Sequence, residues 1–224
     1  DGAVLVGAFF GIAFLITAVM LFAYSRCYWC TLAPLVCSTI AVVWQLGMLQ
    51  TLGMGIDPYS MLVPFLIFAV GISHSVQIIN RFGYNVHGGK NKRDAAWLSF
   101  VRLSKPGFIA LVSCGVGFFT LSVIDIPVIK ELAWVASSGI AILVLTNLVL
   151  LPIVLSYLGI SARCHRYRDR KSSSGFYHWL VVSHNAVPGR ARLIIGVSLV
   201  LAVAGVILGQ QQEIGDLDAG APEL

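Results

Sequence analysis

The chain has 224 residues, of which 58% are hydrophobic and only 11% are charged, and its mean hydropathy is +0.86. Soluble domains carry about 25% charged residues, so this composition excludes an ordinary soluble domain and predicts an integral membrane protein. The net charge of +5 comes from basic residues gathered in a few loops. Such loops are typical of membrane topology, and we do not expect nucleic acid as a partner.

Hydrophobic runs close to the roughly 20 residues needed to cross a bilayer occur six times. They cover residues 3–24, 31–52, 59–80, 106–124, 132–157 and 192–209. The sequence therefore predicts an all-α, polytopic membrane helix bundle with six transmembrane helices. Short interfacial helices are expected at residues 95–103 and 176–181, where apolar residues mix with polar and basic ones. Pro152 is expected to kink the end of the fifth run.

The basic residues lie almost entirely on one side of these runs. Fourteen of the fifteen Lys and Arg fall there, and Lys130 is the exception, whereas eight of the ten acidic residues fall on the other side. By the positive-inside rule the basic loops are cytoplasmic, which puts both ends of the chain on the external side.

The expected organisation has four parts. Residues 1–158 form a five-helix bundle, residues 159–190 a basic cytoplasmic linker with an interfacial helix, residues 191–209 a transmembrane helix, and residues 210–224 the start of an external domain. The chain starts without Met and enters a helix almost at once, so we interpret it as a piece of a larger protein.

Motifs for enzymatic or metal chemistry are missing from the sequence. Cys27 and Cys30 have C-x-x-C spacing, but no second pair or histidine cluster completes a metal site. No Walker A, G-x-S-x-G, H-E-x-x-H or dinucleotide fingerprint occurs. The neighbours Ser73 and His74 diverge by about 100° on a helix, a poor geometry for a nucleophile and its base. We predict no enzyme activity, no cofactor and no metal.

The third run carries a polar stripe in its second half. At roughly 100° per residue, its members fall within about 120° of one another on a helix. They are Ser73, His74, Gln77, Asn80 and Arg81. A polar stripe in a membrane helix is costly unless it faces other helices or water, so by default it marks a functional site.

The order of residues around this stripe is similar to a known family. Pro58…Phe68-Ala-Val-Gly71-Ile-Ser73-His74…Asn80-Arg81 resembles the fourth transmembrane helix of resistance–nodulation–division (RND) transporters, and more narrowly the bacterial MMPL-type exporters and their sterol-sensing-domain relatives. The stretches Ala95-Ala-Trp…Lys105-Pro-Gly-Phe…Phe118-Phe-Thr120 and Ile126-Pro127…Gly139…Leu151-Pro152 are similar to the next two helices. The last run, followed by residues 214–223, resembles the first helix of the second repeat entering its external domain.

The resemblance implies the transmembrane part of a secondary transporter in the bacterial inner (plasma) membrane, exporting hydrophobic or amphipathic substrates or lipids and driven by the proton motive force. The implied partners are the lipid bilayer, the substrate and a second transmembrane half of the same chain, and a homo-oligomer is left open.

One departure from the family concerns its proton carrier. The family places an aspartate where this chain has Ser73, with His74 next, and none of the six runs contains Asp or Glu at depth. The candidate proton-coupling and transport residues are therefore Ser73, His74, Gln77 and Asn80. An unperturbed histidine titrates near pH 6.5, about the working range of a proton carrier. The alternative for His74, Gln77 and Asn80 is interhelical hydrogen bonding without titration.

A second function class fits the same residues. The missing carboxylate favours a sterol-sensing-like module that binds or senses a lipid without transporting it. A channel is disfavoured, because a single polar stripe makes a poor pore lining. A carboxylate in the equivalent helix of the second half would favour the transporter.

Overall fold

The structure is a computed structural model that describes residues 2–53, 61–159 and 188–210. Within these ranges the regular structure is helical throughout, which confirms the predicted all-α class. The chain divides into two compact units, Asp1–Asp169 and Arg170–Leu224.

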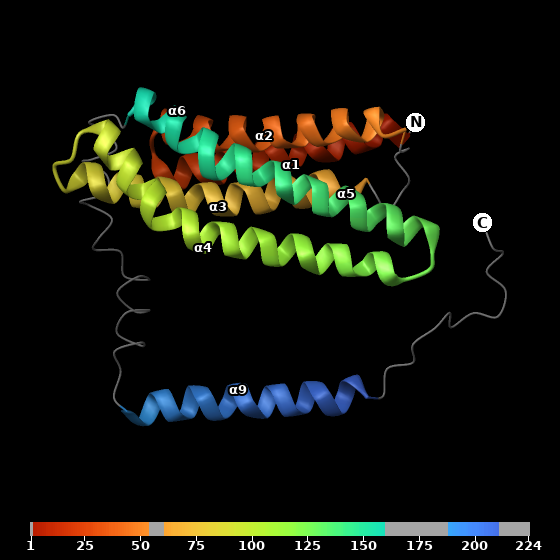
Figure 1. The fold of residues 1–224 in the computed structure, drawn as a ribbon. Coiled ribbons are helices and arrows are strands. Elements are labelled where there is room, and N and C mark those ends of the chain that lie inside the picture. The colour runs from red at the N-terminus through yellow and green to blue at the C-terminus, as the bar shows by residue number, and fades with distance from the viewer. Residues whose placement is uncertain (1, 54–60, 160–187, 211–224) are drawn as a thin grey trace. The chain divides into compact units, whose positions relative to one another are not determined.

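The described helices of the first unit lie side by side along their length (Figure 1). They are α1 (Gly2–Ser25), α2 (Tyr28–Thr51), α3 (Leu62–His87), α4 (Lys92–Thr120), the 3₁₀ turn η1 (Leu121–Val123), and a last rod made of α5 (Pro127–Leu143), the π-helix η2 (Val144–Leu150) and α6 (Leu151–Leu158). Five segments are long and apolar enough to cross a membrane: Gly7–Ser25, Tyr28–Thr51, Leu62–His87, Lys92–Val123 and Pro127–Leu158. α1 packs mainly on α2, whereas α4 packs on α3, α5 and α6.

The second unit contains α9 (Pro188–Gly209) in its described part. This helix covers the residues for which the sequence predicted the sixth transmembrane helix, 192–209. Its apolar portion, Ile195–Gly209, is shorter than the five spans of the first unit. The interfacial helix predicted at residues 176–181 and the external segment after residue 210 lie outside the described residues.

The fourth span differs from the prediction of a separate surface helix at residues 95–103. α4 is one continuous helix through Pro106, so the predicted surface helix is its first part. The helix begins at Lys92 because the side chain of Asn91 accepts a hydrogen bond of 2.8 Å from the backbone N–H of Asp94, as a good N-cap does. Pro106 removes one backbone donor, and packing against neighbouring helices compensates for that loss.

The last rod accommodates Pro152 through a change of helical register. Pro152 cannot donate to the carbonyl of Leu148, and its ring would clash with that oxygen in a regular α-helix. The helix widens into η2 immediately before the proline and then continues as α6. It ends at Gly159, whose φ of 73° lies in the left-handed region that glycine adopts easily.

The core and the outer surface of the first unit are both apolar. Ile67, Phe82 and Leu143 are fully buried between the helices, whereas large side chains such as Leu15 and Ile109 are more than 60% exposed. Soluble monomers rarely expose contiguous apolar surface on this scale. The outer face is therefore suited to contact lipid acyl chains.

Candidate functional site

The polar stripe predicted from the sequence lies on the outer side of α3. Ser73 and Gln77 are exposed, and His74 and Asn80 are partly exposed. The opposite face of α3 packs into the bundle, where Gly71, Ser75, Ile78, Ile79 and Phe82 are all buried. The four candidate residues thus share one helix face, and this face points away from the core of the first unit.

One end of the stripe is attached to α1. The hydroxyl of Tyr24 donates a hydrogen bond of 2.9 Å to the side-chain oxygen of Asn80. Tyr24 lies 56 residues earlier in the chain, so sequence reasoning did not connect it with the stripe. The available signal was its place as a polar-tipped aromatic residue at the end of the first span.

Arg81 closes the stripe at the same end. Its guanidinium carbon lies 5.0 Å from the centroid of the Tyr84 ring, in cation–π geometry. Its Nε is buried and has no hydrogen-bond partner among the described residues. Arg81 is therefore held in place by an aromatic ring, and its Nε–H remains available to donate a hydrogen bond.

A second polar cluster lies inside the bundle, and the sequence analysis missed it. The hydroxyl of Ser75 donates a hydrogen bond of 2.8 Å to the side-chain oxygen of Asn147, which belongs to η2. Both residues are fully buried, as are Ser38 and Gln45 of α2. Gln45 donates through its amide nitrogen to the carbonyl of Val135 at 3.2 Å.

Part of this buried cluster has unused hydrogen-bonding capacity. The Ser38 hydroxyl, the Gln45 side-chain oxygen and the Asn147 side-chain nitrogen have no partner among the described residues. An unsatisfied buried polar group costs about 1–3 kcal/mol, and buried waters commonly satisfy such groups. The sequence signal for this cluster was the presence of polar side chains in three predominantly apolar runs, and no periodicity links one run to another.

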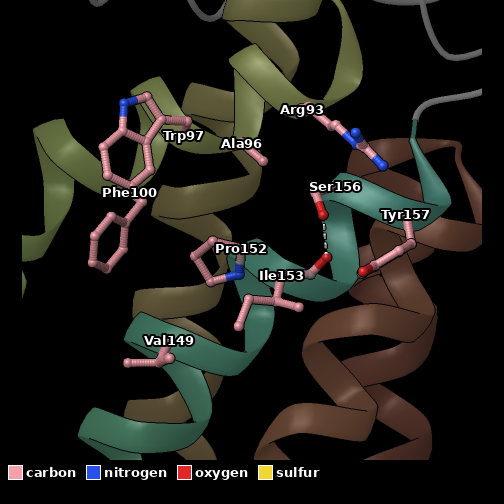
Figure 2. Close-up of a pocket in the computed structure, with 9 residues that line it drawn as sticks. All are labelled: Arg93, Ala96, Trp97, Phe100, Val149, Pro152, Ile153, Ser156 and Tyr157. Atoms are coloured by element: carbon pink, nitrogen blue, oxygen red, sulfur yellow. Dashed lines mark hydrogen bonds between the residues drawn. The ribbon is translucent and has the colours of Figure 1, made fainter.

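A pocket of about 420 Å³ lies between the first turns of α4 and the end of the last rod (Figure 2). Its walls are mostly apolar and aromatic, and one arginine contributes the charged group. The lining residues are Arg93, Ala96, Trp97, Phe100, Val149, Pro152, Ile153, Ser156 and Tyr157. Beside it, the ammonium of Lys92 donates a hydrogen bond of 2.8 Å to the carbonyl of Tyr157 and joins the two helix ends.

Metal chemistry finds no support in the described ranges, where no group of three or more His, Cys, Asp or Glu could hold an ion. The thiols of Cys27, Cys30 and Cys37 are buried at the α1–α2 turn and within α2. The polar stripe itself offers hydrogen-bonding groups and the imidazole of His74, which are means of binding and proton transfer.

Comparison with known proteins places this bundle in a family. The MMPL family profile matches residues 5–190, which include the described helices of the first unit except the first three residues of α1. The chain belongs to the MMPL family. No curated protein matches the chain significantly. Family membership makes this chain part of an RND/MMPL-type transporter, a multi-pass membrane protein, as the resemblance of the sequence implied.

Proposed function

We propose that this MMPL chain is the transmembrane part of a proton-driven exporter of hydrophobic or amphipathic molecules or lipids in a bacterial inner membrane. Its coupling surface is the stripe of Ser73, His74, Gln77 and Asn80. The observation that carries the proposal is the outward position of this stripe on α3, opposite the face that packs into the bundle.

The free-energy cost of exposing polar groups to lipid supports a protein partner for the stripe. An unpaired amide or imidazole in hydrocarbon loses about 1–3 kcal/mol of hydrogen bonding. Gln77 and His74 would both incur this cost if acyl chains covered α3 on that side. Secondary transporters built from repeats place coupling groups at the interface of their halves, so we assign the outer face of α3 to the second transmembrane half.

His74 is the candidate proton carrier. Within the described spans it is the histidine near mid-helix, since His87 ends α3 at the basic loop. The position next to it, Ser73, is where the family resemblance puts the carboxylate. An imidazole can take over proton transfer because its reference pKa is about 6.5, roughly half a unit below neutral pH.

The proposal is tested by His74→Gln in the full-length protein. Glutamine keeps hydrogen-bonding groups but does not titrate, so we expect proton-driven substrate uptake into everted vesicles to be abolished while expression stays normal. His87→Gln is the matched control on the same helix and should transport at the wild-type rate. If His74→Gln also transports at the wild-type rate from about pH 5.5 to 8, His74 does not carry the proton.

A lipid-sensing module that does not transport is the second candidate, because the described spans hold no carboxylate at mid-depth. Ser73→Asp distinguishes the two functions when it is combined with His74→Gln. Recovery of efflux by the added carboxylate favours the transporter. Binding of a lipophilic ligand by the wild-type protein, without proton uptake under an imposed gradient, favours the sensor.

A further inference from the structure

We infer that the pocket between α4 and α6 binds an anionic phospholipid, with the phosphate on Arg93 and an acyl chain along the aromatic wall. None of the residues that line this pocket belongs to the polar stripe of α3, and the inference does not depend on the transport mechanism. It uses the residues of the pocket described above.

The pocket has a cationic side and an apolar side. Figure 2 shows Arg93 above Ser156 and Tyr157, with Trp97 and Phe100 across the pocket. The rings of Trp97 and Phe100 are in contact, with their centroids 5.8 Å apart and their planes tilted by 34°. The Arg93 guanidinium is exposed and makes no hydrogen bond or ion pair within the described residues, whereas neighbouring Lys92 is occupied by the Tyr157 carbonyl. The arginine is thus available for an anion, and a phosphate suits its planar donors.

The lengths of the two rods place the pocket at headgroup level. Lys92–Val123 and Pro127–Leu158 each have 32 residues. At 1.5 Å per residue each rod is about 48 Å long, whereas the hydrocarbon core is about 30 Å thick. The part of α4 that extends beyond the hydrocarbon core is its Lys92 end. The four basic residues of the helix all precede Pro106, and none follows it within the helix. The pocket is at that end, where phosphate groups and the first acyl carbons lie.

The residues that line the pocket also indicate a position at the level of the lipid headgroups. Trp97 and Tyr157 are 64% and 70% exposed, and tryptophan and tyrosine concentrate at the membrane–water interface. Ile153 and Val149 continue the wall toward the apolar part of the rod. The volume of about 420 Å³ falls within the roughly 300–1,000 Å³ of typical ligand sites.

The charge of the neighbouring chain favours a lipid over a segment of the protein itself. The stretch that follows the last rod, residues 163–171, carries five Lys and Arg and one Asp. Like charges would repel it from Arg93. An anionic lipid has the complementary charge and is present at this depth in the membrane.

The test uses Trp97 as a reporter in the reconstituted chain, with the other four tryptophans replaced by phenylalanine. Two sets of phosphatidylcholine vesicles are compared. One set contains brominated phosphatidylglycerol, and the other contains the same fraction of brominated phosphatidylcholine. In both probes the bromine atoms lie near the top of the acyl chain. We expect brominated phosphatidylglycerol to quench Trp97 more strongly than brominated phosphatidylcholine does. Arg93→Gln should reduce the apparent preference about fivefold, the effect of one basic group near an anionic surface.

Arg102→Gln is the matched control, because Arg102 is exposed on the same helix but does not line the pocket. It should keep the preference, and Arg93→Lys, which retains the charge, should keep most of it. Equal quenching by the two lipids, or a preference unchanged in Arg93→Gln, overturns the inference. Weak quenching by both lipids also overturns it, since another protein segment or a second copy would then cover the pocket.

Discussion

Gly71 brings three helical segments together on the buried face of α3. A Cβ at this position would lie 2.8 Å from the Ser38 hydroxyl oxygen, 2.9 Å from the Asn147 side-chain nitrogen and 3.0 Å from a methyl of Leu143. Such distances are shorter than van der Waals contact, so the glycine permits the close approach. The same residue belongs to the motif that resembles the MMPL family, and packing of the polar cluster gives it a structural role.

Gly71→Ala should therefore destabilise the bundle by about 1–3 kcal/mol, the usual cost of overpacking a core. Gly117→Ala is the control, because no atom lies within 4 Å of its added Cβ. Alanine there should leave the stability unchanged or raise it by up to about 1 kcal/mol through helix propensity. Thermal unfolding of the purified protein in detergent measures both. Equal melting temperatures for the two variants would contradict the role of Gly71.

At the scale of elements, η2 is joined to α3 by a hydrogen bond between side chains. π-helical segments occur often at functional sites, and this one contains Asn147, the acceptor of the Ser75 hydroxyl. The register change before Pro152 thus coincides with the buried polar cluster. Hydrogen bonds of this kind between membrane helices contribute about 0.6 kcal/mol on average, with a maximum near 1.7.

A double-mutant cycle with Ser75→Ala and Asn147→Leu should give a coupling free energy in that range, about 0.6–1.7 kcal/mol. Each single variant leaves a buried polar group without its partner, whereas the double variant removes both. Thr120→Val serves as the control partner for Ser75→Ala, because the Thr120 hydroxyl bonds to the Gly117 carbonyl within its own helix. Chemical unfolding in mixed micelles gives the energies, and strict additivity of Ser75→Ala and Asn147→Leu would refute the contact.

For the whole molecule, orientation in the membrane follows from charge. The α3–α4 loop and the first part of α4 are basic, whereas the turn between η1 and α5 holds Asp125 in an exposed ion pair of 2.6 Å with Lys130. An exposed pair of this kind contributes about 0–1 kcal/mol, so a cysteine is tolerated there. The structure also shows that Gly89 has a φ of 84° and is a strained place for a cysteine, whereas neighbouring Lys90 is exposed.

Single cysteines at Lys90 and Asp125, in a background without the five native cysteines, should therefore react differently with an impermeant thiol reagent in intact cells. We expect Asp125→Cys to be labelled and Lys90→Cys to be protected until the membrane is opened. Labelling of Lys90→Cys alone would reverse the proposed topology.

The sequence by itself determined the properties that depend on short stretches. Hydropathy over about 20 residues identified the spans, and the helical period put Ser73, His74, Gln77 and Asn80 on one face, since both are local properties of the chain. Only the tertiary structure decided which face of α3 is buried, that Tyr24 bonds to Asn80, and that Ser75 meets Asn147 across 72 residues. It also decided that residues 95–103 continue into the fourth span, because α4 is held by its neighbours on both sides of Pro106. These contacts depend on how distant helices dock, and nearly uniform apolar runs do not specify that docking.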